Sequence, residues 1–389
     1  MIQRERNHLD LTTFLAVFIL MILSLGVVYS ASSTWAMEKW GESGRLLGSH
    51  VLKVLTGFVA MFVFMQIDYH KYRKLTKPAL MLALGLLVVT LILGGEVKGA
   101  SRWLRLGGFG LQPSEFAKYA LIFHLCVLIV EKKDRVKDLK TGFLPMMVWI
   151  GAVTVLVLAQ PNFSNGAMIF LISLVMLFIG RARLSHLALT CTALVPLLVG
   201  YMLSADYRMR RIMSFFGGGT GKSSYQLDQG IIAFGNGGLF GLGPGGSRQR
   251  DLFLPESYGD FVFSIVGEEY GLIGTLFLVV LFLTILLGGM KIAKHAPDDF
   301  GQTLAIGITI AITLYALVNA GVTLGILPTT GLPMPFVSYG GSSMFFSSVA
   351  IGVLMNISTQ TDLHPRVSGA PESVRPLEPV QRSAVGSVY

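Results

Sequence analysis

The sequence predicts an all-α integral membrane protein with about ten transmembrane helices and one large extracytoplasmic loop between the seventh and eighth of them. Hydrophobic residues make up 52% of the chain and charged residues 14%, whereas soluble domains carry about 25% charged residues. Apolar runs of about 17 to 25 residues, long enough to cross a bilayer, recur along nearly all of the chain. The composition therefore excludes a water-soluble fold.

The first apolar run, from Leu11 to Tyr29, exceeds the roughly 7 to 15 residues of a signal-peptide core, so we interpret it as an uncleaved helix. Together the runs predict a transmembrane domain over 11–357. Its expected helices lie near 11–30, 49–66, 79–95, 113–131, 143–160, 166–180, 185–204, 261–290, 301–326 and 339–357.

Short basic loops predict the orientation. With the start inside, the following residues fall in cytoplasmic loops, as the positive-inside rule requires: Lys71, Arg73, Lys74, Lys77, Lys132, Lys133, Arg135, Lys137, Lys140, Arg181, Arg183, Lys291 and Lys294. An even number of spans places both 1–10 and the tail 358–389 in the cytoplasm, and the tail lacks periodicity and is predicted to be disordered. Orientation thus explains the net charge of +9 without a nucleic-acid partner.

Other basic residues break this rule because they fall on the outer side: Lys98, Arg102, Arg105, Arg208, Arg210, Arg211, Lys222, Arg248 and Arg250. The loop 205–260 is the longest connection, and long loops on rigid scaffolds are commonly functional. For 208–222 a solvated loop explains the charges equally well. The stretch Gly217 to Ser223 imitates a phosphate-binding loop, but Phe216 stands where that motif needs glycine, so we expect no nucleotide site.

Lys98, Arg102 and Arg105 surround Trp103 in the segment KGASRWLRLG. Arginine offers a planar fork for phosphate oxygens, and tryptophan anchors at the headgroup level. The segment predicts binding of a lipid-linked pyrophosphate, with simple headgroup anchoring as the alternative.

Two further segments carry polar groups at membrane depth. In Gln112-Pro-Ser114-Glu115-Phe-Ala-Lys118 the two charged residues are spaced i,i+3 and should face the protein interior. Structural pairing and substrate contact both remain open for them. In Gln160-Pro-Asn162 the amides predict positioning of sugar hydroxyls only, because no group there ionises.

The segment LPESYGDF places Glu256 and Asp260 where the long loop enters a helix. Asp260 is predicted to be a general base, since partial desolvation raises a carboxyl pKa, and capping of the helix is the alternative. Glu268 and Glu269 lie about two turns deeper and are predicted to be buried network residues. After three prolines, Ser338, Gly340, Gly341 and Ser342 predict an anion-binding nest or a substrate wall.

Together the motifs KGASRWLRLG, QPSEFAK, GIIAFGNGGLFGLGPGGSRQ, LPESYGDFVFSIVGEEYG and LPTTGLPMPFVSYGGSS resemble the SEDS family of FtsW, RodA and SpoVE over roughly 12–360. The last motif is more similar to the FtsW branch than to the RodA branch. The resemblance implies polymerisation of lipid II into glycan strands at the outer face of the bacterial cytoplasmic membrane, with release of undecaprenyl pyrophosphate. Similarity to the FtsW branch implies that this takes place at the division septum.

By the same resemblance Asp260 would deprotonate the acceptor 4-hydroxyl, and Lys98, Arg102, Arg105 and Arg248 would offset the charge of the leaving group. The family implies a class B penicillin-binding transpeptidase and other divisome membrane proteins as partners, with lipid II and nascent glycan as ligands. It implies no firm cofactor and no protein-bound metal, although a divalent cation assisting the pyrophosphate is compatible. Two departures from the family pattern are Asn162 in place of Asp, and Ser-Tyr-Gly in place of Ala-His-Thr before Asp260.

Two other functions stay open at this point. A lipid II flippase would need the same spans and cations, but the halves of the chain are not self-similar and the polar groups gather on the outer side. A non-enzymatic division scaffold would fit the Asn162 departure, but it would not need Asp260.

Overall fold

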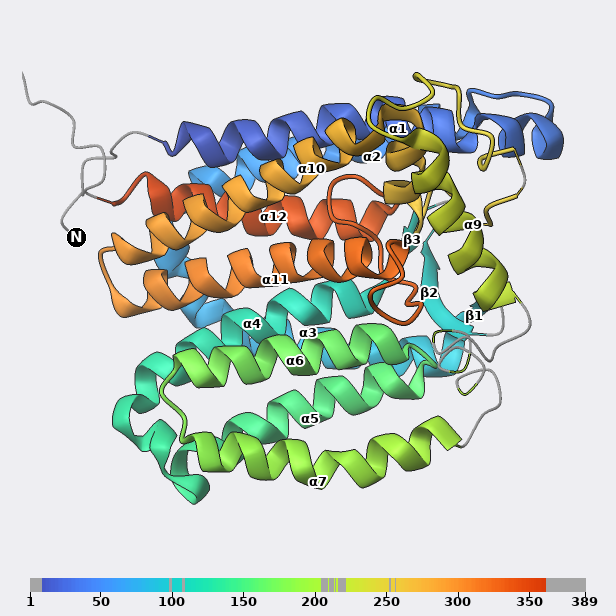
Figure 1. Ribbon diagram of the computed structural model, residues 1–389. Coiled ribbons are helices and arrows are strands. Elements are labelled where there is room, and N and C mark those ends of the chain that lie inside the picture. The colour runs from blue at the N-terminus through green and yellow to red at the C-terminus, as the bar shows by residue number, and fades with distance from the viewer. Residues whose placement is uncertain are drawn as a thin grey trace, which may run out of the picture.

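The structure is a computed structural model that describes residues 9–97, 100–106, 109–203, 209, 213, 215, 222–251, 253–255 and 257–361. Within these residues, ten long helices lie side by side and run between two ends of the molecule (Figure 1). They are α1 (Leu11–Trp40), α2 (Arg45–Gln66), α3 (Tyr72–Leu93), α4 (Pro113–Lys132), α5 (Leu144–Ala159), α6 (Phe163–Ile179), α7 (Leu184–Leu203), α10 (Val262–Lys294), α11 (Asp299–Thr323) and α12 (Gly341–Ser358). The helical membrane fold expected from the sequence is confirmed.

The helices have the length and composition of membrane spans. Eight of those in the described residues are long and apolar enough to cross a bilayer, while α6 and the 184–196 part of α7 are shorter apolar helices. Large apolar side chains such as Val59 and Ile92 are exposed on the outside of the bundle, where lipid replaces water as the solvent. The chain is a multi-pass membrane protein.

Helices α4 and α12 form the centre of the bundle. In each of them 78% of the most apolar stretch is buried, against 28% for α3. Helix α12 packs closely on α2 because glycines face the contact: a Cβ on Gly352 would lie 2.5 Å from the Met61 carbonyl oxygen, and one on Gly57 would lie 2.9 Å from Ser348 Oγ. Small residues at such contacts let membrane helices approach.

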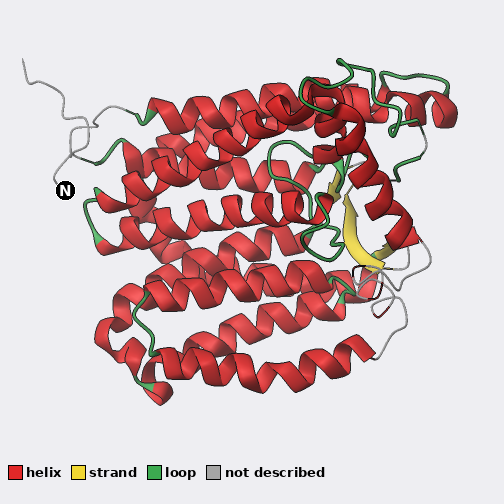
Figure 2. Ribbon diagram, in the orientation of Figure 1, coloured by secondary structure: helices red, strands yellow, loops and turns green. Residues whose placement is uncertain are grey.

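The two ends of the bundle differ in their connections. Three strands and the longest loops gather at one end, which we call the loop-rich end (Figure 2). There β1 (Gly95–Val97), β2 (Ala100–Leu106) and β3 (Phe109–Leu111) form an antiparallel sheet in the order β1-β2-β3, in which Arg105 pairs with Gly110. Helix α9 (Lys222–Gly237) lies across the same end (Figure 1). The sequence analysis predicted neither α9 nor the sheet.

The opposite end, which we call the short-loop end, carries the 3₁₀ helices η1 (Tyr69–Lys71) and η2 (Lys133–Lys137) and the π-helix η3 (Leu139–Phe143). Asp10 N donates to Ser358 Oγ at 3.3 Å, so the start of α1 and the end of α12 meet here. Residues 1–8 of the predicted N-terminal segment 1–10 lie outside the described residues, and so do residues 362–389 of the predicted tail 358–389.

Several predicted boundaries were wrong. Helix α1 continues ten residues beyond the expected end at 30 and stops at Gly41, whose φ of 72° is left-handed and whose N–H bonds the Met37 carbonyl, a common glycine ending. Helix α3 begins at Tyr72 instead of 79, because Pro78 falls inside the helix and does not start it. A hydropathy pattern marks the lipid-crossing part of a helix and not its extension into the headgroup region.

Candidate active site

Asp260 lies at the loop-rich end, in the turn that leads into α10. The N-cap residue of α10 is Phe261, which makes no side-chain cap hydrogen bond, and the roles of Asp260 as general base or as cap of this helix both stay predictions. Asp260 is partly exposed. Its Oδ2 lies 3.3 Å from the point that a Cβ on Gly331 would occupy. The carboxylate therefore faces the proline-rich loop 324–340 that connects α11 to α12.

Asn319, near the end of α11, holds the two sides of this site together. Its Nδ2 donates to the Asp260 carbonyl oxygen at 2.7 Å and to the Leu332 carbonyl oxygen at 2.8 Å. The side chain is buried. One amide thus sets the turn before α10 and the loop after α11 relative to each other. The sequence analysis missed Asn319, although a polar residue inside an apolar run is itself a signal.

Tyr258 and Tyr339 form a second contact between these two segments. Tyr339 N donates to the Tyr258 carbonyl oxygen at 2.9 Å, and the rings meet edge to face with centroids 5.7 Å apart. Trp35 of α1 packs on Tyr258 at 5.4 Å. Burial, and to a smaller extent Tyr339, raises the pKa of Tyr258, so its hydroxyl stays protonated at neutral pH.

The four residues predicted to form a nest or wall divide into two kinds. Ser338 Oγ accepts from Met334 N at 2.8 Å, and Ser342 Oγ accepts from Gln112 N at 2.9 Å and donates to the Gly110 carbonyl oxygen at 3.2 Å. Both serines are buried, whereas the backbone of Gly340 and Gly341 is partly exposed. Ser338 therefore closes a turn within the loop 324–340, and Ser342 ties the start of α12 to β3 and to Gln112, the N-cap residue of α4. Substrate contact by any of the four stays a prediction.

Glu115 and Lys118 pair with each other inside the bundle. Lys118 Nζ lies 2.8 Å from Glu115 Oε2, and each side chain is 2% exposed. The ammonium also lies 4.0 Å from the ring centroid of Tyr315. Tyr315 donates to Asn165 Oδ1, and Asn165 Nδ2 donates to Ser114 Oγ at 2.9 Å. This buried network joins α4, α6 and α11, and the sequence analysis missed Asn165 and Tyr315.

Gln160 and Asn162 lie between α5 and α6 at the loop-rich end. Gln160 is fully buried and its Nε2 donates to the Leu87 carbonyl oxygen of α3 at 3.0 Å. Asn162 is the N-cap residue of α6, is 8% exposed and makes no side-chain cap hydrogen bond. Gln160 therefore ties α3 to the α5–α6 turn, and contact of either amide with sugar stays a prediction.

The predicted cations are distributed unevenly. Lys98 and Glu256 lie outside the described residues, as do the side chains of Arg102 and Arg105, whose backbone belongs to β2. Arg248 is exposed.

Arg250 points inward, and its Nη1 lies 2.8 Å from Ser30 Oγ of α1. The Arg250 guanidinium is therefore in contact with another side chain of the protein. A cation that the sequence analysis missed, Lys53 of α2, lies with Nζ 3.3 Å from the Tyr339 ring centroid.

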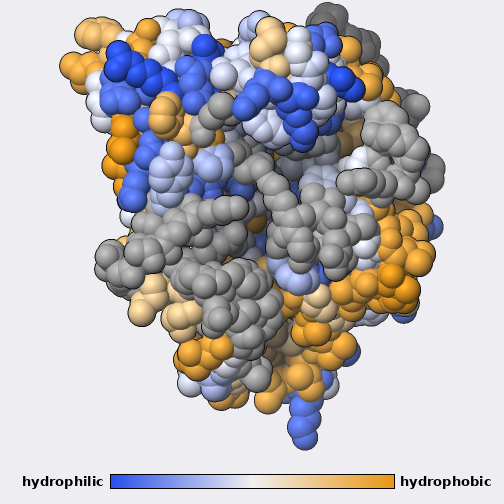
Figure 3. All heavy atoms as spheres, turned by 90° about the vertical axis from the view of Figure 1, so that its right-hand side faces the viewer, coloured by the Kyte–Doolittle hydropathy of each residue, from blue (hydrophilic) through white to orange (hydrophobic). Residues whose placement is uncertain are grey.

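Figure 3 looks onto the loop-rich end. Hydrophilic residues gather over its upper part, and hydrophobic residues cover much of the lower right flank. Among the described residues no three His, Cys, Asp or Glu side chains lie together as a metal-binding group. At Asp260 the available chemistry is that of a partly exposed carboxylate, with the aromatic rings of Tyr258 and Tyr339 and the amide of Asn319 in the segments that hold it.

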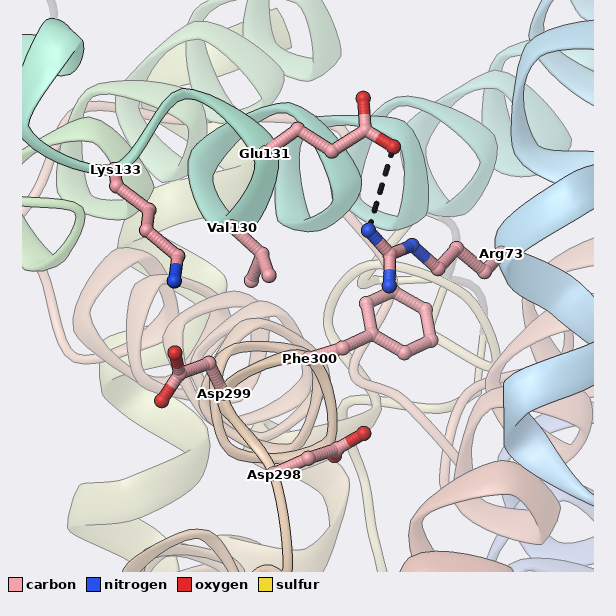
Figure 4. Close-up of a pocket in the computed structure, with 7 residues that line it drawn as sticks. All are labelled: Arg73, Val130, Glu131, Lys133, Asp298, Asp299 and Phe300. Carbon is pink, nitrogen blue, oxygen red and sulfur yellow. Dashed lines mark hydrogen bonds and ion pairs between the residues drawn. The ribbon is translucent and has the colours of Figure 1, made fainter.

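A pocket at the short-loop end has a different character (Figure 4). It encloses about 470 Å³ and is lined by Arg73, Val130, Glu131, Lys133, Asp298, Asp299 and Phe300. Arg73 Nη2 lies 3.5 Å from Glu131 Oε1, so the two exposed charges pair with each other. The pocket lies at the opposite end from Asp260 and takes no part in that site.

Comparison with known proteins identifies the family. The model of the family described as cell cycle protein, FtsW/RodA/SpoVE, matches residues 10–363. The chain belongs to this family. Among its relatives, the probable peptidoglycan glycosyltransferase FtsW of Geobacter metallireducens is 38% identical over 92% of this chain and 96% of its own. Stage V sporulation protein E of Bacillus subtilis is 37% identical over 91% and 98%.

Solved structures of the family share the fold. A chain from a study of the structural coordination of polymerization and crosslinking by a peptidoglycan synthase complex matches with a TM-score of 0.75 and 23% identity, over 90% of this chain and 97% of that one. The rod shape determining protein RodA of Thermus thermophilus matches with a TM-score of 0.68 and 23% identity, over 91% and 98%. The fold assignment thus rests on independent structures.

Within the FtsW/RodA/SpoVE family this chain's Ser-Tyr-Gly before Asp260 has a visible structural role. Ser257 Oγ donates to the Ala31 carbonyl oxygen of α1 at 2.8 Å, and Tyr258 packs between Trp35 and Tyr339. Ser257 and Tyr258 therefore fasten the Asp260 turn to α1.

Proposed function

We propose that this protein is a peptidoglycan glycosyltransferase that polymerises lipid II on the outer face of the bacterial cytoplasmic membrane. The observation that carries the proposal is the placement of Asp260, a partly exposed carboxylate held from two sides at the loop-rich end of a membrane bundle. Relatives that cover nearly the whole chain are named probable peptidoglycan glycosyltransferase FtsW.

The distribution of charge supports the proposed orientation. Basic residues between α2 and α3, between α4 and α5, between α6 and α7 and between α10 and α11 gather at the short-loop end. By the positive-inside rule this end faces the cytoplasm. Asp10 and Ser358 are in contact at this end, so both chain termini would be cytoplasmic and Asp260 would face outward.

In the proposed reaction Asp260 accepts the proton of the acceptor 4-hydroxyl as that oxygen attacks C1 of the donor sugar. The C1–O bond to the diphosphate breaks with inversion, and undecaprenyl pyrophosphate leaves with the bonding electrons. A positioned general base of this kind typically contributes about 10² to 10⁴-fold to rate. Lys98, Arg102, Arg105 and Arg248 would offset the charge on the leaving diphosphate. A divalent cation, if present, would arrive on the diphosphate as part of the substrate.

We also propose a class B penicillin-binding transpeptidase as partner, acting with other divisome membrane proteins at the septum. The likeness to a chain of a complex named for polymerization and crosslinking supports a partner that crosslinks. The FtsW relatives at about 38% identity support duty in division.

The test is glycan synthesis from purified lipid II by this protein with its transpeptidase partner in lipid nanodiscs. Wild type should make long glycan, and Asp260→Ala should make less than about 1% as much, since a general base is lost. Glu42→Ala is the matched control, because Glu42 is an exposed carboxylate at the same end, and it should leave the rate unchanged.

Three outcomes would contradict the proposal. Equal synthesis by wild type and Asp260→Ala would remove the role of Asp260. Absence of synthesis by a folded, partner-bound wild type, with movement of labelled lipid II between leaflets, would favour a flippase. Absence of both activities would favour a scaffold.

A further inference from the structure

Helix α10 is broken close to the candidate active site. Gly271 has φ 63° and ψ −159°, which is not helical, so the segment 262–270 forms a separate half-helix directly after Asp260. A break leaves the last carbonyls of one half and the first N–H groups of the other without helical partners. The direction of the half-helix, and with it the place of Asp260, therefore depends on what fills the break.

A glycine-rich segment after α9, residues 237–243, fills it, and we call this segment the strap. Leu242 N and Gly243 N donate to the carbonyl oxygens of Glu268 and Glu269 at 2.9 and 3.0 Å. In the other direction, the N–H groups of residues 272 and 273 donate to the carbonyl oxygens of residues 238 and 239 at 2.9 and 3.2 Å. The strap thus bonds to both halves of α10 at once.

The glycines of the strap allow this close approach. A Cβ on Gly237 would lie 1.9 Å from the Gly267 carbonyl oxygen, and one on Gly241 would lie 2.1 Å from the Glu269 carbonyl oxygen. Gly241 also has a left-handed φ of 82°, which side chains rarely adopt. No other residue fits these two positions, so the glycines are required by the contact itself.

The side chain of Glu268 fastens the segment on both sides of the strap. Asn236 Nδ2 donates to Oε1 at 3.0 Å, Gln249 N donates to Oε2 at 3.1 Å, and the Ser247 hydroxyl donates to Oε2. Glu268 is fully buried. In all three of these hydrogen bonds another residue donates and the Glu268 side chain accepts. The prediction that Glu268 is a buried network residue is confirmed.

Glu269 extends the same arrangement to α1. Ser30 Oγ donates to its Oε1 at 2.5 Å, and Arg250 Nη1 lies 3.9 Å from that oxygen and 2.8 Å from Ser30 Oγ. The loop after the strap, the half-helix and α1 therefore form one hydrogen-bonded unit.

We propose that Glu268 is a positioning residue for the polymerisation reaction. Through the strap it sets the direction of the half-helix 262–270 and so holds Asp260 at the acceptor hydroxyl. This inference rests on the proposed glycosyltransferase function. Glu268 is buried and lies about 12 Å along the helix from Asp260, at 1.5 Å per residue, so it acts through the backbone and does not touch the substrate.

The test removes the acceptor oxygens of Glu268 and then gives one back. Met has a similar length but no oxygen, so in Glu268→Met the donors of Asn236, Ser247 and Gln249 lose their acceptor. Gln keeps one acceptor oxygen for Ser247 and Gln249, and its NH₂ group meets Asn236, whose amide can turn its own oxygen to accept. Glu268→Gln should therefore keep the hydrogen bonds, with the direction of the bond to residue 236 reversed.

For E268M we expect a kcat about 10 to 100-fold below wild type with KM for lipid II unchanged, because a displacement of about 1 Å can cost 10²-fold. Hydrogen exchange at residues 242, 243, 272 and 273 should accelerate in E268M, whereas E268Q should keep slow exchange and most of the kcat. N236D faces Glu268 with a second carboxylate and should resemble E268M.

An unchanged kcat in E268M with accelerated exchange would overturn the proposal, and so would an E268Q variant that keeps slow exchange but loses activity. If E268M does not fold, Ser247→Ala removes one donor more gently and gives the same two readouts. Failure of wild type to polymerise lipid II would defeat the proposed function, whereas hydrogen exchange would still decide whether Glu268 holds the strap.

Discussion

Replacing Lys118 by Met tests how the buried charge pair contributes to the fold. Lys118 Nζ lies 2.8 Å from Glu115 Oε2, and both side chains are 2% exposed. The substitution keeps the volume but leaves Glu115 buried without its cation. Breaking a buried pair in this way costs about 3 to 5 kcal/mol.

The control compares this pair with an exposed pair of the same spacing. Lys137 and Asp134 are also i,i+3 and lie 3.1 Å apart, but they are 46% and 89% exposed. Lys137→Met should change stability by less than about 1 kcal/mol, because water screens exposed pairs. The double variant E115Q/K118M removes both charges and should recover most of the stability lost in K118M.

Thermal unfolding can be followed through Cys126, which is fully buried, by its reaction with a thiol-specific fluorophore. Cys191 is exposed and is replaced by Ser in every variant. K118M should unfold several degrees below K137M. Equal midpoints for K118M and K137M would refute the reasoning. Glycan synthesis then separates the two interpretations of the pair: a stable but inactive E115Q/K118M indicates substrate contact, and a stable and active one indicates a structural pair.

Three other predictions concern single contacts. Asn319→Leu removes the donor to the Asp260 and Leu332 carbonyls. It should lower the free energy of unfolding by about 1 to 3 kcal/mol and lower the polymerisation rate. An unchanged rate would show that the Asp260 turn is held by other contacts. Gly331→Ala places a Cβ 3.3 Å from Asp260 Oδ2 and should lower kcat several-fold, whereas Gly26→Ala, whose Cβ would meet nothing within 4 Å, should not. Burial tends to raise the pKa of Asp68, but hydrogen bonds from the backbone and ring of His70 outweigh it and hold this pKa below 3.8. The stability that Asp68 contributes is therefore present above pH 3.8 and is lost as the pH falls through the lower pKa of the folded state. The unfolding midpoints of wild type and Asp68→Asn should differ at pH 7 and converge in acid.

The ten helices could be predicted because apolar runs recur along the chain and short basic loops separate many of them. Charged residues inside or beside those runs could be singled out for the same reason: Glu115, Lys118, Asp260, Glu268 and Glu269 all have positions that a membrane disfavours without partners. For the buried pair and for Glu268 and Glu269, the structure shows those partners.

The strap and the sheet could not be predicted in the same way. The strap contacts α10 mainly through backbone groups, and its glycines are required by distances to residues about 30 positions away. Hydropathy and periodicity carry no information about such contacts. Asn319 was missed because one amide changes the hydropathy of a long apolar run very little, although its two hydrogen bonds join the sides of the site.

Several helix starts at the short-loop end are capped by aspartates, although the N-cap residues of α3 and α5, Lys71 and Phe143, make no side-chain cap hydrogen bond. Asp10 accepts from Thr13 N at the start of α1, Asp298 from Gly301 N at the start of α11, and Asp138 from Thr141 N at the start of η3. Aspartate caps satisfy first-turn N–H groups and place a negative charge at the positive end of the helix dipole. They offset the positive ends of these helices at the end where the basic loops gather.

Five helix starts at the loop-rich end, all with described N-cap residues, lack a side-chain cap from those residues. The N-cap residues of α2, α4, α6, α10 and α12 make no side-chain cap hydrogen bond, and none of them carries a charge: Gly44, Gln112, Asn162, Phe261 and Gly340. Each helix start contributes a partial positive charge of about half an elementary charge. Five such charges face the end that carries Asp260 and are not neutralised by their own caps. An asymmetry of this kind favours an anionic substrate at the loop-rich end, and a diphosphate leaving group from the membrane is the anion that the proposed reaction brings there.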